Sequence, residues 1–243
     1  MEPGKEAGGS EPHLFATTDG SYMVKACNNP QLPGAPRLLV NELIGGLCLD
    51  WLDVRHPECA VIDVPAEVVQ DSPGAKFSNG NPVGSGKGFG SEHWQSDPAG
   101  TVGVDLLAKA EIAGTVAFDT WIRQGDSRQY RVRKSTENPG KYDFIPVDHG
   151  HSIGPAWTAE ALNGDHAVAI AAPVAPIEAA DIEVFIHRLR QFKEDDAKHI
   201  VSQIPIDWLA EADGKALIDY LVARAGAAAT ALAGQYPTGG PVP

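Results

Sequence analysis

Four charged residues follow one another in an order that suits phosphate chemistry. Lys25 ends the strand-like run YMVKAC, and Glu42 follows in the apolar helical run around LVNELI. A lysine on a strand can contact phosphate oxygens, and a glutamate on the next helix can hold that lysine in place. Asp126 and Asp148 come later, on either side of an expected β-hairpin. Two such carboxylates are what phosphoryl transfer needs, one near the attacking hydroxyl and one holding Mg²⁺.

Each of these residues also has a purely structural interpretation. A strand lysine often points to solvent, a glutamate beside an apolar stripe is often a boundary residue, and aspartate is common in turns. Asp119 lies seven residues before Asp126, on the same helical face if the helix continues. Gly125 is expected to end that helix. This leaves Asp126 in a loop and makes Asp119, beside Phe118 and Trp121, a candidate buried structural carboxylate.

The stretch FIPVDHGHSIG raises a second possibility, because it presents His149 and His151 at the end of a strand. A zinc site would need a third His, Cys or Glu ligand at suitable spacing. His166 is available, but its Ala-rich surroundings do not support it as a ligand. A zinc-dependent hydrolase is therefore the weaker hypothesis, and the histidines are expected to neighbour a nucleotide-bound metal instead.

The glycine-rich stretch GNPVGSGKGFGSE does not satisfy the phosphate-loop pattern of Gly, four residues, then Gly-Lys-Ser/Thr. Asn81 stands where the first glycine belongs, and Gly88 follows Lys87 where Ser or Thr belongs. We interpret the stretch as a flexible linker, and residues 71–103 as the junction between two lobes.

The elements that would position these residues can be read from periodicity and turn signals. The runs HLFATT and SYMVKAC predict a hairpin with a two-residue turn at Asp19-Gly20. Residues 37–52 predict a helix, although Gly45 and Gly46 inside it cost about 1 kcal/mol each relative to Ala. Further predicted elements are a strand at 59–64, a short helix at 65–69, a helix at 105–124, a hairpin at 129–148, and helices at 181–192, 195–204 and 214–233. This order predicts an α+β, bilobal protein with a β-rich N-terminal part containing one long helix, and a mainly helical C-terminal part.

Composition limits the class of partner. The 243 residues carry a formal net charge of −13, which argues against nucleic-acid and membrane-surface partners, although a small basic pocket inside an acidic shell remains compatible. The three cysteines form no metal-binding spacing, and there is no apolar signal region at the N-terminus. The longest apolar run falls short of a membrane span. We expect a soluble, unanchored, cytoplasmic protein with reduced thiols.

With these residues assembled, the sequence resembles the HipA-like kinase family, whose members have a protein-kinase/phosphatidylinositol-kinase-like fold. The resemblance covers most of the chain. Its most specific parts are GGSEPHL with YMVKACNNPQ and NELI, and FDTW with GDSRQ and DHG.

The resemblance implies an ATP site in the N-terminal part. Gly8, Gly9 and Ser10 resemble the phosphate-covering turn, Lys25 the lysine that contacts ATP phosphates, and Glu42 its partner on the helix. The run GFGSE resembles the strand that enters the hinge between the lobes, where adenine stacks.

The resemblance also implies catalytic and metal-binding roles. Asp126 resembles the aspartate that orients the acceptor hydroxyl, and Asp148 the metal-binding aspartate. Kinases of this type normally carry Asn five residues after the catalytic aspartate as a second metal ligand, but here that position is Arg131. Gln129 could ligate the metal through its carbonyl instead, and Arg128 and Arg131 could neutralise phosphate charge.

The sequence therefore predicts an ATP- and Mg²⁺-dependent phosphotransferase that acts on a Ser/Thr hydroxyl of a protein, or on a small molecule. The missing Asn keeps open a pseudokinase, a nucleotide-binding interaction module without turnover. We expect a flexible N-terminus at 1–12 that includes part of the phosphate loop, an N-lobe at 13–92, a C-lobe at 93–235 and a disordered tail at 236–243.

Overall fold

The computed structural model describes residues 11–29, 35–153, 162 and 168–237. Gly8, Gly9, Ser10, His166 and most of the predicted tail lie outside these residues. The first elements in chain order are β1 (His13–Ala16), β2 (Ser21–Ala26), α1 (Ala35–Leu52), β3 (Cys59–Val64), α2 (Ala66–Gln70) and β4 (Gly86–Glu92). They are followed by β5 (Asp97–Pro98), the 3₁₀ turn η1 (Val104–Leu106), α3 (Lys109–Ile122), β6 (Gln129–Lys134), β7 (Tyr142–Val147), α5 (Ala179–Gln191), α6 (Glu194–Ser202) and α7 (Glu211–Gln235).

The first sheet has four antiparallel strands in the order β1-β2-β4-β3. Its β1-β2 hairpin is present as predicted, but the prediction of a two-residue turn at Asp19-Gly20 is wrong. Ala16 pairs with Ser21, so that Thr17–Gly20 form a four-residue turn, closed by the Thr17 N–H, which donates to Gly20 O at 2.7 Å.

Strand β4 corrects the interpretation of the glycine-rich stretch. The segment Gly86–Glu92 is an inner strand between β2 and β3, and not a flexible linker. A Cβ atom on Gly90 would lie 2.4 Å from Cγ1 of Ile62 on β3, so a glycine is needed where the two strands pack closely. The strand that the family resemblance implies at GFGSE is present.

The second sheet has three antiparallel strands in the order β5-β6-β7. Strands β6 and β7 form the predicted hairpin, in which Gln129 pairs with Val147 and Arg131 with Ile145. The predicted helices at 105–124, 181–192, 195–204 and 214–233 are present as α3, α5, α6 and α7, with shifted ends.

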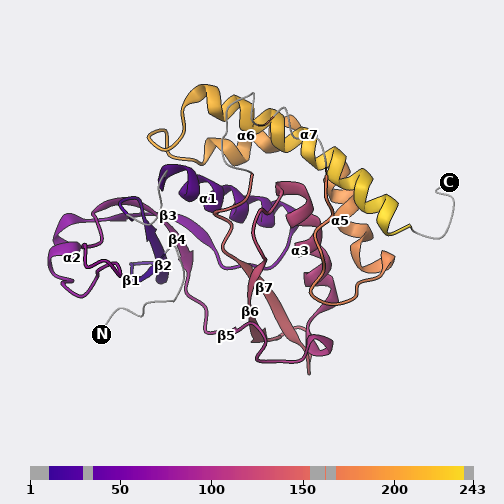
Figure 1. The fold of residues 1–243 in the computed structure, drawn as a ribbon, viewed down its shortest axis with the longest axis horizontal. Helices are drawn as coiled ribbons and strands as arrows, with labels where there is room; N and C mark the ends of the chain where they lie inside the picture. The colour runs from indigo at the N-terminus through magenta and orange to yellow at the C-terminus, as the bar shows by residue number, and fades with distance from the viewer. Residues whose placement is uncertain (1–10, 30–34, 154–161, 163–167, 238–243) are drawn as a thin grey trace.

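Helix α1 lies between the four-stranded sheet and the helices of the C-terminal part (Figure 1). It contacts β3 and β4 on one side and α3, α5 and α6 on the other. Its Trp51 packs edge-to-face on Trp121 of α3 and on Phe192 after α5, with ring centroids 5.9 and 4.7 Å apart. Side chains of α1, α3, α5 and α7 belong to one hydrophobic cluster, so that α1 ties the two parts together.

Helix α7 is, among the described helices, the one that is long and apolar enough to cross a membrane, with a mean hydropathy of 1.3 over its most apolar window. It packs against α3, α5 and α6, and 44% of that window is buried. Leu217, Leu221 and Leu232 on this helix are fully buried.

The paired glycines inside α1 are explained by close contacts. A Cβ atom on Gly45 would lie 2.5 Å from Cβ of His149, and one on Gly46 would lie 2.5 Å from Sγ of Cys59. The helix tolerates their low propensity because they allow β3 and the segment after β7 to approach its surface.

We expect Gly45→Ala to destabilise the fold by about 1–3 kcal/mol, because the added methyl group overpacks the contact with His149. Gly226→Ala is the matched control, because a Cβ atom on this α7 glycine would meet nothing within 4 Å. The control should be neutral or stabilising by up to about 1 kcal/mol. Urea unfolding of both variants measures the difference, and equal effects would contradict the packing explanation.

A buried charge cluster joins α3 to β7. Asp143 of β7 is fully buried and accepts hydrogen bonds from Arg55 at 3.0 Å and Arg133 at 3.2 Å. Glu111 of α3 lies beside it and accepts a hydrogen bond from the Phe144 N–H. Burial, with a contribution from the charge of Asp143, raises the pKa of Glu111 to about 7, although the Phe144 N–H and Arg55 oppose the shift.

This raised pKa predicts a specific pH dependence. Between the pKa of an unfolded glutamate and pH 7, the folded protein holds a proton on Glu111 that the unfolded chain has lost, so stability falls as pH rises. Glu111→Gln removes this dependence. We expect wild type to lose about 2 kcal/mol relative to the variant between pH 5 and pH 7.5. Denaturant unfolding at several pH values tests this, and a constant difference would refute it.

Candidate active site

Lys25 on β2 is the centre of a buried charge triad. Its Nζ donates a hydrogen bond to Oε1 of Glu42 on α1, and a second one to Oδ1 of Asp148, after β7, at 3.0 Å. The side chains of Lys25 and Glu42 are 11% and 3% exposed, whereas that of Asp148 is 27% exposed. The predicted residues Lys25, Glu42 and Asp148 are therefore in contact, and Asp148 is the most solvent-exposed of the three.

Electrostatics keep the exposed end of this triad charged. Burial works against the charge on Lys25, but Glu42 and Asp148 outweigh it and raise the pKa of Lys25. Burial likewise opposes ionisation of Asp148, yet Lys25 holds the pKa of that carboxyl well below its usual range. Burial raises the pKa of Glu42, and Lys25 and the His149 N–H act against this rise.

The turn after β7 is held in an unusual conformation. Asp148 has φ = 62°, in the left-handed region that non-glycine residues rarely adopt. Oε2 of Glu42 accepts a hydrogen bond from the His149 N–H at 2.9 Å. Asn41, also on α1, donates its Nδ2–H bonds to Gly150 O at 2.9 Å and Ser152 O at 2.7 Å. Helix α1 therefore fixes the turn that presents Asp148.

A second buried ion pair supports the same turn from α3. Asp119 pairs with Arg128, and their side chains are 6% and 8% exposed. Nη1 of Arg128 donates to Val147 O at 2.8 Å and to Asp148 O at 3.3 Å. Asp119 is thus a buried structural carboxylate, as predicted, which positions Arg128 against the end of β7.

The histidines of this stretch have different surroundings. His149 is buried against Phe118, with ring centroids 5.2 Å apart, and its Nδ1 lies 3.2 Å from Nη1 of Arg128. Burial, and then the charge of Arg128, lower the pKa of His149 well below its usual value. His151 is exposed. Over the residues that the structure describes, no group of three or more His, Cys, Asp or Glu could hold a metal ion, so the zinc hypothesis has no support there.

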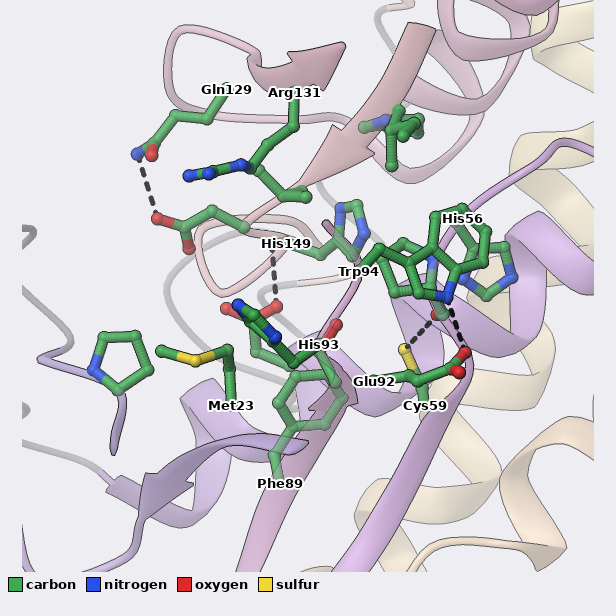
Figure 2. A pocket seen from close by; sticks show the side chains of 18 of the residues that line it. Met23, His56, Cys59, Phe89, Glu92, His93, Trp94, Gln129, Arg131 and His149 are labelled. Atoms are coloured by element: carbon green, nitrogen blue, oxygen red, sulfur yellow. Dashed lines mark hydrogen bonds between the residues drawn. The ribbon is translucent and has the colours of Figure 1, made fainter. Parts of the chain in front are cut away.

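Gln129, and not Arg131, faces Asp148. Nε2 of Gln129 donates to Oδ2 of Asp148 at 2.9 Å. Arg131 lies two residues further along β6 on the same face, and it donates from Nε to Ser96 Oγ at 2.9 Å and from Nη2 to Ser96 O at 3.0 Å. The two side chains project side by side into the pocket (Figure 2). The residue beside Asp148 is therefore an amide that could turn its carbonyl oxygen toward a metal.

These groups line one pocket between the two sheets. Met23 and Phe89 lie on one side of it, and Gln129 and Arg131 on the opposite side (Figure 2). The empty space of the pocket, counting the part that opens to solvent, is about 930 Å³.

The pocket has an apolar wall that includes Met23, Phe89, Trp94, Ile145 and Val147. Sequence reasoning pointed to the run GFGSE, which contains Phe89, but missed the other four residues. Strand alternation could have found part of it, because Met23 stands two residues from Lys25, and Ile145 and Val147 pair with Arg131 and Gln129.

Asp126 lies outside this pocket. It is exposed in the loop between α3 and β6 and lines a neighbouring pocket, and its Oδ1 accepts a hydrogen bond from the Ser127 N–H at 2.7 Å. The loop is bound to the turn after β7, because the Gly125 N–H donates to His151 O at 3.1 Å and Gln124 Nε2 to Asp148 O at 3.4 Å. The structure thus brings the loops of Asp126 and Asp148 together while their side chains occupy different pockets.

A β-rich part with a Lys–Glu pair, joined through α1 to a helical part, defines a kinase-like fold. A solved structure that shares it is that of the Helicobacter pylori proinflammatory kinase CtkA, with a TM-score of 0.61 and 10% sequence identity, covering 96% of this chain and 94% of that chain. The sequence model of the HipA-like kinase family matches residues 4–226. The chain belongs to the HipA-like kinase family. A comparison with curated proteins finds no match.

The two aspartates seven residues apart should behave differently when neutralised. Asp119→Asn leaves Arg128 buried without its counter-charge, so we expect a loss of about 3–5 kcal/mol of stability. Asp126→Asn is the matched control, because Asp126 is exposed, and its effect should stay within about 0.5 kcal/mol. Urea unfolding measures both, and a small effect of Asp119→Asn would show that the ion pair does not support the turn.

Proposed function

We propose that this protein is an ATP- and Mg²⁺-dependent phosphotransferase that transfers the γ-phosphate to a Ser/Thr hydroxyl of a protein. The observation that carries the proposal is the buried Lys25, shared between Glu42 and Asp148 at the wall of a pocket. In this proposal residues 13–92 form the N-lobe and residues 93–235 the C-lobe. Gly8, Gly9 and Ser10 remain the predicted phosphate-covering turn.

The pocket offers separate surroundings for the two ends of a nucleotide. Its apolar side chains, Met23, Phe89 and Ile145 among them, suit a base, and its charged end suits phosphates. The charge of Lys25 is already shared with two carboxylates. Among the described residues that line the pocket, Arg131 is the other Lys or Arg, so it is the residue that can neutralise further phosphate charge. Its two hydrogen bonds to Ser96 hold the guanidinium in place for a phosphate oxygen.

The residues present fit a magnesium ion bound together with a nucleotide. Mg²⁺ is usually held by one or two carboxylates plus substrate phosphates and waters, and Asp148 supplies one charged carboxylate, with the Gln129 amide beside it. When bound, the ion would neutralise charge on the transferring phosphate and help to align it. The protein's part is to keep Asp148 ionised and fixed in its turn, which Lys25 and Glu42 do.

In this proposal Asp126 acts on the acceptor. Its exposure allows a hydroxyl to approach, and a carboxylate there can accept the hydrogen bond that orients the hydroxyl and can take up its proton. The hydrogen bonds from Gly125 and Gln124 to the turn after β7 hold the loop of Asp126 at a fixed position relative to Asp148.

A pseudokinase is the second candidate, and Arg131 favours it. A cation stands at the position where related kinases carry a second metal ligand, and the amide that faces Asp148 is a weaker ligand than a carboxylate. In that case nucleotide binding would serve to stabilise a conformation for a partner.

Asp126→Asn and Asp148→Asn separate these candidates. We expect MgATP to raise the melting temperature of wild type and of Asp126→Asn alike, whereas Asp148→Asn loses the Mg²⁺-dependent part of the rise. Transfer of labelled phosphate to the protein itself or to casein should fall about 10²- to 10⁴-fold in Asp126→Asn.

Asp71→Asn, in the exposed turn after α2, is the control and should match wild type in both measurements. If wild type binds nucleotide but transfers no phosphate, the result supports the pseudokinase. Absence of binding to any nucleotide would remove both candidates, and unchanged transfer by Asp126→Asn would overturn the role of that residue.

A further inference from the structure

A second pocket lies on the other side of the turn after β7 from the nucleotide pocket. The described residues that line it come from the start of α1, the end of α3 and the turn itself. They are Arg37, Leu38, Asn41, Arg123, Gly125, Asp126, Gly150 and His151.

Gly150 separates this pocket from the Lys25 triad. A Cβ atom on Gly150 would lie 3.1 Å from Oε1 of Glu42 and 3.8 Å from Oδ1 of Asp148. At Gly150, the backbone that lines the second pocket carries no side chain and lies directly against Glu42 and Asp148. A group that enters beside Asp126 comes close to the edge of the site where phosphates are proposed to bind.

The described residues that line the second pocket carry more basic than acidic side chains, although the whole chain is acidic. The protein has a formal net charge of −13, whereas these lining residues include Arg37, Arg123 and His151 and, among the described ones, the carboxylate of Asp126. Nε of Arg37 is buried and has no hydrogen-bond partner among the described residues. A buried guanidinium N–H is costly to leave unpaired, so an acidic group that enters this pocket would gain a charge-assisted hydrogen bond.

We propose that this pocket is the acceptor site and that it selects a Ser or Thr flanked by acidic or phosphorylated residues. The inference rests on the proposed phosphotransferase function. The hydroxyl would lie at Asp126, and the neighbouring carboxylate or phosphate would bind Arg37 and Arg123. The acidic remainder of the surface disfavours nucleic acid, and salt screening over about 10 Å limits its repulsion of a short acidic peptide that reaches the basic side chains.

Three peptides of one sequence test the proposal, with the central Ser flanked by Glu, by phosphoserine or by Lys. We expect wild type to phosphorylate the Glu and phosphoserine peptides with a kcat/KM at least 10-fold higher than the Lys peptide, mainly through KM. Arg37→Glu should reduce this preference at least 10-fold. Arg123→Asn should act in the same direction, and Asn tolerates the left-handed backbone of Arg123, whose φ is 57°.

Arg190→Glu on the exposed side of α5 makes the same charge change far from the pocket and should leave the preference unchanged. Melting temperatures with and without MgATP show whether each variant is folded and binds nucleotide. If no peptide is phosphorylated, transfer to the protein itself or to casein decides the proposed function, and fluorescence anisotropy with the labelled phosphoserine and Lys peptides still tests the pocket. Selective binding that Arg37→Glu abolishes supports the acceptor site, whereas equal binding of the two peptides, or a preference for Lys, overturns it.

Discussion

The buried carboxylate of Glu42 is the interaction on which the rest of the site depends. One of its oxygens holds Lys25 on β2, and the other accepts the backbone N–H of His149 after β7. A carboxylate that is 3% exposed is tolerated in a core only with a cation and hydrogen-bond donors around it. The same contacts that satisfy Glu42 therefore fix the distance between the first sheet and the turn that carries Asp148.

The turn after β7 is held from two sides. Glu42 and Asn41 bind it from α1, and Arg128, itself held by Asp119, binds the end of β7 from the side of α3. These contacts offset the cost of the left-handed backbone at Asp148, typically about 1–3 kcal/mol. They also separate the two aspartates, because Asp148 faces the pocket between the sheets and Asp126 faces its neighbour.

Local patterns predicted the elements better than the contacts between them. Strand alternation was enough to predict both hairpins, although not the length of the first turn, and an apolar stripe was enough for α1. Glycine was misleading in β4, where it permits close packing against Ile62 and does not mark a linker. The same residue type inside α1 looked like a weakness of the helix, but Gly45 is required by the approach of His149, 104 positions later in the chain. Nothing near Gly45 in the sequence indicates that contact.

The sequence by itself determined the order of Lys25, Glu42, Asp126 and Asp148, the types of element that carry them, and the resemblance to the family to which the chain belongs. Only the tertiary structure decided that Gln129 faces Asp148, that Arg131 is held by Ser96, and that Asp126 lies in a separate basic pocket. The physical reason is that periodicity depends on neighbours within a few residues, whereas these contacts arise from the packing of α1 between distant parts of the chain.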